Sequence, residues 1–251
     1  AEEQEAQYDA SAKRLLGQKI ILAHILVSTV DDFKNMTPKE AAECIEGDPK
    51  IGSIPVEPGH TNQKHNGGKI AGLNGESAEH NEGLIRFDIV FYVRLKDGLS
   101  QIIINVEAQK DEPSKYQIIN RAIFYASRLI SSQKERDFVN SEYDNIKKVY
   151  SIWVCMNMRD NTLNHIHLTD DKKIGSYTWD GKLDLFNIVM IGLGVSIPEH
   201  DETYELHRLL GALLSMDLTA EEKLNIMKQE YKIPMEQKLE EGVKVMCNLS
   251  Q

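Results

Sequence analysis

Cysteine is scarce in this chain, and long apolar runs are missing from it. The 251 residues include three cysteines, Cys44, Cys155 and Cys247, which lie far apart. This spacing excludes a disulfide framework and a paired-cysteine metal site, and it favours reduced thiols in a cytoplasmic protein. No apolar stretch is long enough to cross a bilayer, so we expect no membrane association. The acidic start AEEQEAQYDA also lacks the basic region of a secretory signal.

Positive charge is in deficit. Lys and Arg number 29 against 39 Asp and Glu, which gives a net charge of −10. Broad, nonspecific adhesion to nucleic acid is therefore excluded, although a local basic groove is not. The composition, 41% hydrophobic and 27% charged, is typical of a folded globular protein. The length suits one domain with a helical extension.

The strongest local pattern is a β-hairpin. Two β-rich segments, 84–95 and 101–109, are joined through Asp97-Gly98, a pair that favours tight hairpin turns. With these two residues at the tip, the residue numbers of each facing pair add up to the same value. One face of the hairpin is then wholly apolar: Ile89 faces Val106, Phe91 faces Ile104, Val93 faces Ile102 and Phe87 faces Ala108.

The other face of this hairpin places Asp88 opposite Glu107, and Arg86 opposite Gln109. Two facing carboxylates repel each other unless a positive group lies between them. A divalent metal is the simplest such group, and oxygen ligands favour Mg²⁺ or Mn²⁺ over zinc. The alternative is an outer sheet face that carries ordinary solvated charges.

Hydrophobic periodicity predicts further helices and strands. We expect helices over 13–27, 37–46, 114–137, 204–216, 220–231 and 235–249, strands over 148–156, 165–170 and 185–193, and a long loop over 47–81 with one short strand near 54–56. The helix over 114–137 has a core stripe of Ile119, Ala122, Ile123, Ala126, Leu129 and Ile130.

Three side chains leave two interpretations open. Lys19 interrupts an apolar helical stripe, so it either extends to water or enters the active site. His165 and His167 point the same way from a strand, as exposed histidines or as a zinc pair without a third ligand. Arg128 is expected to be a surface charge.

A family resemblance follows from these residues. Asp88 with Glu107-Ala108-Gln109 on the neighbouring strand, followed by a helix, resembles the core of the PD-(D/E)XK nuclease superfamily. Longer segments resemble its recombination-promoting nuclease and transposase branch: KRLLGQKIILAHIL, CIEGDP, GLNGESAEHNEGLIRFDI, INVEAQ, RAIFYASRLISSQ and KKVYSIWVC. The resemblance extends from about residue 13 to residue 251.

The resemblance implies a restriction-endonuclease-like α/β sandwich with a central mixed sheet, in which an antiparallel meander carries the acids. Residues 1–200 would form this core. Residues 201–251 would form a helical extension that packs on the core or joins two copies into a homodimer.

The implied activity is Mg²⁺-dependent DNA endonuclease cleavage, linked to recombination or mobile elements. Asp88 and Glu107 would ligate Mg²⁺ or Mn²⁺, with the carbonyl of Ala108 as a third oxygen. The metal would activate water and stabilise charge on the scissile phosphate. Glu82 is a further candidate ligand or base, or else a residue that caps a loop.

One position departs from the superfamily pattern, because Gln109 stands where the signature lysine is expected. Glutamine carries no charge and shuttles no proton, although it can hold a water molecule. The general-base role is then open, with Lys19 as one candidate. Arg121 and Tyr125 would position the phosphate backbone, or would brace the hairpin instead. The competing hypothesis is a noncatalytic DNA-binding or assembly protein that keeps the nuclease fold.

Overall fold

The computed structural model describes residues 2–56, 85–95 and 101–248. Its centre is a six-stranded mixed sheet in the order β1-β2-β3-β4-β6-β5. The strands are β1 (Ile45–Val56), β2 (Ile85–Arg94), β3 (Gln101–Gln109), β4 (Val149–Met158), β5 (Thr162–His167) and β6 (Phe186–Gly194). The first three form an antiparallel meander, β3, β4 and β6 run parallel, and β5 returns antiparallel to β6.

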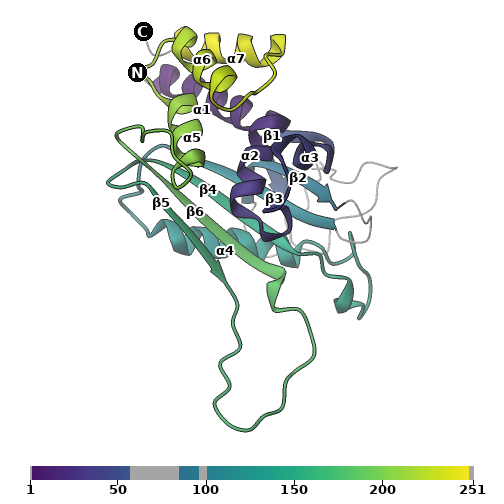
Figure 1. The fold of residues 1–251 in the computed structure, drawn as a ribbon. Helices are drawn as coiled ribbons and strands as arrows, with labels where there is room; N and C mark the ends of the chain where they lie inside the picture. The colour runs from purple at the N-terminus through teal and green to yellow at the C-terminus, as the bar shows by residue number, and fades with distance from the viewer. Residues whose placement is uncertain (1, 57–84, 96–100, 249–251) are drawn as a thin grey trace.

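Helices cover both faces of this sheet (Figure 1). The helices are α1 (Glu2–Leu16), α2 (Lys19–Thr29), α3 (Pro38–Glu43), α4 (Ile118–Ser131), α5 (Glu205–Leu214), α6 (Ala220–Gln229) and α7 (Gln237–Asn248). On one face, α4 packs Ala122 and Ala126 against Trp153 of β4. The main core on the other face joins α1, α2, α5, α6 and α7 to the sheet. The expected restriction-endonuclease-like α/β sandwich is thus confirmed.

The hairpin register is confirmed from Arg94–Gln101 to Ile89–Val106, whereas the expected pairs Asp88–Glu107, Phe87–Ala108 and Arg86–Gln109 lie beyond the end of the pairing. Ile89 pairs with Val106, Phe91 with Ile104 and Val93 with Ile102. Ile89, Val93 and Val106 belong to the main core, as the alternation of a strand requires. The turn residues 96–100, like Glu82, lie outside the described residues, so the two-residue turn stays a prediction.

The expected loop is wrong for residues 47–53, because they belong to β1, whereas the short strand expected near 54–56 is confirmed as the end of β1. Glycine and proline led to the loop interpretation, and the strand accommodates them through irregular pairing. Its register shifts between Glu46 and Lys50 and again between Ile51 and Ile54. Gly47 and Gly52, with φ of 62° and 111°, lie at these shifts, where bulges need positive φ. The rest of the expected loop lies outside the described residues.

The first helix differs from the expectation in two ways. The single helix over 13–27 is wrong, because α1 ends at Leu16 and α2 begins at Lys19. Helix α1 also begins much earlier, at Glu2. A Cβ at Gly17 would approach the side chain of Ile51 to 2.4 Å, so glycine lets β1 pass close to this break.

The remaining helices lie where they were expected, with shorter ends. Strands β4 and β6 lie within two residues of their expected bounds, whereas β5 begins and ends three residues before the expected strand over 165–170. Helix α3 has the predicted capping box, in which Thr37 and Glu40 bond each other's backbone N–H groups, and it ends at Glu43. Two side chains on α4 were placed wrongly. Ile123 is exposed rather than part of the core stripe, and Arg128 is 5% exposed rather than a surface charge.

The C-terminal helices share the main core with α1, α2 and the sheet. The buried side chains of α7, Leu239, Val243, Met246 and Cys247, belong to this cluster. A division of the chain at residue 200 stays a prediction. None of the described helices combines the length and apolar character that a membrane span needs.

Candidate active site

The site forms where β2 and β3 part. Their pairing runs from Arg94–Gln101 to Ile89–Val106 and is not continued beyond that point. Past it, β2 stays with β1, where Phe87 pairs with Ile54, whereas β3 stays with β4. The two strands therefore diverge immediately beside Asp88 and Glu107.

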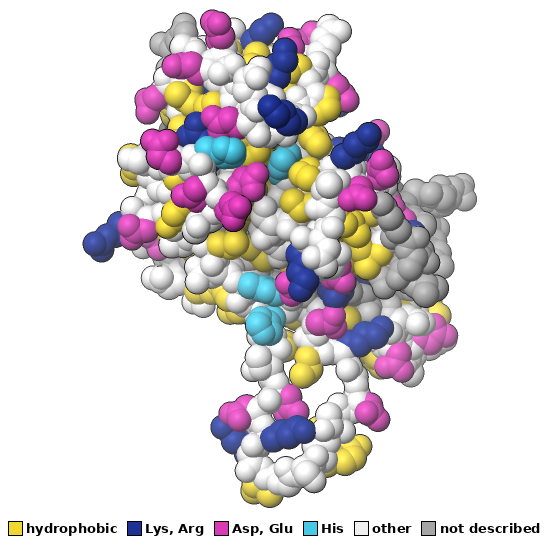
Figure 2. All heavy atoms as spheres, in the orientation of Figure 1, with side chains coloured by type: hydrophobic (Ala, Val, Ile, Leu, Met, Phe, Trp, Pro, Cys, Tyr) yellow, Lys and Arg dark blue, Asp and Glu magenta, His cyan; other side chains and the backbone are white. Residues whose placement is uncertain are grey.

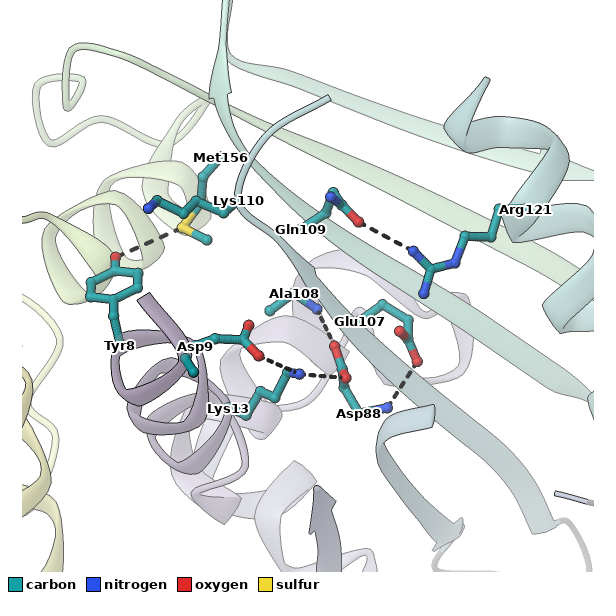
Figure 3. Close-up of a pocket in the computed structure, with 11 residues that line it drawn as sticks. Tyr8, Asp9, Lys13, Asp88, Glu107, Ala108, Gln109, Lys110, Arg121 and Met156 are labelled. Carbon is teal, nitrogen blue, oxygen red and sulfur yellow. Dashed lines mark hydrogen bonds and ion pairs between the residues drawn. The ribbon is translucent and has the colours of Figure 1, made fainter. Parts of the chain in front are cut away.

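The two acidic side chains bridge this opening reciprocally (Figure 3). The backbone N–H of Asp88 donates to Oε1 of Glu107 at 3.0 Å, and the N–H of Ala108 donates to Oδ2 of Asp88 at 3.1 Å. Each carboxylate thus bonds the backbone of the opposite strand where ladder pairing has ended.

A lysine from α1 provides the positive charge beside Asp88. Lys13 Nζ lies 2.8 Å from Oδ1 of Asp88 and 2.6 Å from Oδ2 of Asp9. Burial lowers the pKa of Lys13, but hydrogen bonds to Asp88 and Asp9 outweigh that effect and raise its pKa overall. Lys13 is therefore a cation at neutral pH. The facing acids were expected to need a metal, and part of that need is met by this lysine and by two backbone N–H groups.

Lys13 enters the site because of the way α1 packs. Tyr8, Ala12, Leu15 and Leu16 are buried in the main core, and their spacing is that of one helical face. Asp9 and Lys13 are one turn apart beside this face. The same spacing in the sequence was a signal that the helix extends toward the N-terminus. Lys19 begins α2 and does not line the pocket, so the lysine beside Asp88 is Lys13.

Gln109 and Arg121 form the other wall. The amide of Gln109 donates to the carbonyl of Asp111 at 2.7 Å and accepts from Nη1 of Arg121 at 3.5 Å. Arg121 also donates to the hydroxyls of Tyr116 and Tyr125, at 3.1 and 2.9 Å.

These contacts raise the pKa of the Arg121 guanidinium and fix its orientation. Burial lowers the pKa of Arg121, but the bonds to Tyr125 and Tyr116 raise it overall. Tyr125 does not line the pocket. Tyr125 thus supports Arg121, and Arg121 itself faces the pocket.

The resulting pocket has a volume of about 440 Å³ and lies between α1, α4 and the end of β3. It brings together four predicted site residues, Asp88, Glu107, Ala108 and Gln109, with the predicted DNA-contact residue Arg121. It adds residues that the sequence interpretation missed: Tyr8, Asp9, Lys13, Lys110 and Met156. Three acidic and three basic side chains line the pocket. The pocket therefore lacks the excess of negative charge that the whole chain has.

The donor set suits a hard cation. Within the described parts of the chain, no group of three His, Cys, Asp or Glu side chains could hold a metal ion. Asp88 and Glu107 nevertheless offer oxygen ligands from neighbouring strands. Mg²⁺ is commonly held by one or two carboxylates, with water and substrate phosphate as its other ligands. Two acids on an open pocket therefore fit Mg²⁺ or Mn²⁺, and they do not fit a closed zinc site.

His165 and His167 are exposed on β5, with ring centroids 5.0 Å apart, as the strand alternation predicted. Nε2 of His165 lies 2.9 Å from Oδ1 of Asn187. Among the described residues, no third His, Cys, Asp or Glu lies where it could share a metal ion with these two histidines. They lie on the strand farthest from β3 on that side of the sheet, away from the pocket.

The chain was matched to a protein family over part of its length. Residues 70–185 match the family described as PD-(D/E)XK nuclease family transposase. The match includes Asp88, Glu107, Gln109 and Arg121, whereas Lys13 lies outside it. Searches of curated proteins and of solved structures give no match. The PD-(D/E)XK resemblance inferred from the sequence is confirmed over residues 70–185, and this segment contains the divergence between β2 and β3.

Proposed function

We propose that the protein is a metal-dependent endonuclease that hydrolyses phosphodiester bonds in DNA, associated with recombination or mobile elements. The observation that carries the proposal is the meeting of Asp88 and Glu107 at the divergence of β2 and β3, in a pocket that also holds Lys13 and Arg121. The PD-(D/E)XK nuclease family supports the class of reaction.

Asp88 and Glu107 are the residues that would hold Mg²⁺ or Mn²⁺. When bound there, the cation would supply Lewis-acid stabilisation of the negative charge that develops on the phosphate. Glu107 is 2% exposed, and the N–H of Asp88 fixes one of its oxygens. Ala108 lines the same pocket and orients Asp88 through its N–H. Its carbonyl as a third ligand, and Glu82 as a further one, remain part of this proposal.

Lys13 would take the place of the absent signature lysine. Its raised pKa keeps it protonated, so it acts as a fixed positive charge and not as a base. An ammonium group beside Asp88 is well placed to stabilise a phosphate bound at the carboxylates. Gln109 then has a positioning role, since its amide oxygen accepts from Arg121.

Arg121 is the candidate contact to the DNA backbone. Its guanidinium is held by Gln109, Tyr116 and Tyr125, which fixes its direction before DNA binds. Guanidinium groups bind phosphate oxygens through paired N–H donors. Lys110 adds a second positive charge to the pocket wall. The net charge of −10 opposes general adhesion of the chain to DNA, so binding would depend on these few positive side chains gathered at the pocket.

A noncatalytic DNA-binding or assembly protein is the second candidate. It is favoured by Gln109 at the position of the signature lysine, and by the ion pair that already joins Lys13 to Asp88. Such a protein binds DNA with a salt dependence set by a few phosphate contacts, and it does not cut DNA when Mg²⁺ is added.

Supercoiled plasmid separates the two candidates. The wild-type protein should nick or linearise it with Mg²⁺ or Mn²⁺, and EDTA should stop the reaction. Asp88→Asn and Glu107→Gln should each abolish cleavage while DNA binding persists in a gel-shift assay. Glu112→Gln is the matched control, because Glu112 is an exposed acid outside the pocket. Cleavage that survives both site variants would refute the roles given to Asp88 and Glu107.

A further inference from the structure

A long arm leaves the body between β5 and β6. Residues 168–182, here called the arm, extend away from the sheet in Figure 1, and Figure 2 shows hydrophobic side chains at its outer end. Ile174 is 98% exposed, Trp179 83% and Tyr177 70%. The rings of Tyr177 and Trp179 contact each other, with centroids 5.3 Å apart. Large apolar side chains gathered on a projecting segment mark an interaction surface.

The two edges of the sheet are built differently. Strand β1 carries Pro49, Lys50 and Pro55 and two register shifts, all features that oppose pairing with another strand. Strand β5, with the sequence TLNHIH, has no proline, lysine or acidic residue. Five of its six side chains are exposed, including Leu163 at 46%. Among the described residues, β5 pairs only with β6. This edge is therefore open to a further strand.

The occupant of this surface should be a protein and not DNA. The arm contains three lysines and three aspartates, so its net charge gives no attraction to phosphate. Its lysines also have local contacts: Lys173 with Asp171, and Lys172 with Thr178.

The position of the arm supports the same conclusion. The arm ends shortly before Phe186, the first residue of β6, and this end of the arm is here called its root. Phe186 pairs with Val149 of β4, whereas Glu107 of the candidate site pairs with Trp153, four residues further along β4. At about 3.3 Å per residue, the root lies roughly 13 Å toward the far end of the sheet, and the arm runs onward from there. The arm thus extends away from the candidate active site.

We propose that the partner is a second copy of this chain, joined by antiparallel pairing of β5 with the β5 of the other copy. A strand that pairs with its own copy in this way satisfies two-fold symmetry, so one surface serves both subunits. The arms leave from the ends of the paired strands. Each arm then lies against the partner, where Ile174, Tyr177 and Trp179 lose their contact with water.

The area that this pairing would bury is close to that of a standard dimer interface. An aromatic side chain buries about 150–250 Å², so Tyr177 and Trp179 together contribute roughly 300–500 Å² per subunit. The six-residue edge of β5 and Ile174 add to this. The sum approaches the roughly 800 Å² per partner of a standard interface. A dimer through the C-terminal helices would bury less apolar area, because the apolar face of α7 is already buried in the main core.

The mass of the particle in solution tests this assignment. Light scattering after gel filtration should give the wild-type chain twice its mass of 28.5 kDa. The double variant Ile174→Ser/Trp179→Ser and the edge variant Leu163→Lys should each shift the protein to monomer, with circular dichroism unchanged. Phe124→Ser is the matched control, since Phe124 is 58% exposed on α4, and it should stay dimeric. Val245→Asp, on the exposed side of α7, should also stay dimeric.

Single cysteines introduced along β5 give a second test that does not depend on losing the dimer. The three native cysteines are buried, so they should not cross-link. Under mild oxidation, cross-linking should peak at the one or two positions nearest the two-fold axis and fall off on both sides. The proposal is overturned by a wild-type monomer at tens of micromolar, or by a dimer that only Val245→Asp disrupts. Arm variants that weaken DNA binding and leave the mass unchanged would also overturn it, in favour of nucleic acid.

Discussion

Replacing Lys13 by methionine should reduce the cleavage rate far more than the stability. The ammonium group of Lys13 lies 2.8 Å from Asp88 and 2.6 Å from Asp9, and 17% of its side chain is exposed. Ion pairs with partial solvent access contribute about 0.2–1 kcal/mol, so we expect a loss of about 1 kcal/mol in unfolding free energy. Methionine keeps the packing of the aliphatic stem.

The effect on the rate is expected to be larger because the charge acts on the transition state. Removing one group that stabilises developing negative charge typically lowers kcat by about 10²–10³, or roughly 3–4 kcal/mol. Single-turnover nicking of plasmid with Mg²⁺, alongside urea unfolding, separates the two effects. Lys13→Arg should retain part of the rate. Lys34→Met is the control, because Lys34 is exposed and lies outside the pocket.

A second-site change makes this prediction sharper. Gln109 lines the same pocket from β3, at the position of the signature lysine. Adding Gln109→Lys to the Lys13→Met protein should therefore raise its cleavage rate by about tenfold or more over that of Lys13→Met alone. A Lys13→Met protein that cleaves at the wild-type rate would refute the reasoning. So would a rate that falls only in proportion to the unfolded fraction.

Three further predictions follow from single contacts. Glu107→Gln should abolish plasmid cleavage with thermal stability nearly unchanged, because a glutamine oxygen can still accept from the N–H of Asp88; an active variant would contradict the role of Glu107. Burial lowers the pKa of His24 from 6.5 to about 4, so its neutral form contributes stability that is complete above pH 6.5 and lost as the pH falls toward 4. The loss amounts to about 3 kcal/mol. Urea titrations of His24→Phe should show a weaker pH dependence over that interval, and an unchanged slope would contradict this. Arg208→Met should lower the unfolding free energy by about 1–3 kcal/mol, because Arg208 binds Glu230 through two nitrogens at 2.6 and 2.7 Å; an unchanged urea midpoint would contradict this.

The hairpin could be predicted because its information is local. A tight turn and two alternating strands fix which residues face each other, and the register from Val93 to Ile89 agrees with that reasoning. The same register places the two acids directly after its last pair, Ile89–Val106. The sequence could not predict where the pairing ends, since that depends on how β2 stays with β1 and β3 stays with β4.

Lys13 and β1 show why the rest could not be predicted. Lys13 reaches Asp88 only because α1 packs on the sheet, a contact between residues 75 positions apart in the chain. Strand β1 has the glycine and proline content of a loop, and its pairing with β2 overrides that local preference. Arg128 was misplaced for a similar reason, because its burial is a property of the assembled fold.

The most direct test of the site is anomalous diffraction from a crystal soaked in Mn²⁺. If Asp88 and Glu107 form the metal site, one anomalous peak will lie between their carboxylates, and it will disappear in Asp88→Asn. A crystal that shows no peak there, with Lys13 still paired to Asp88, would contradict metal-dependent hydrolysis at this site.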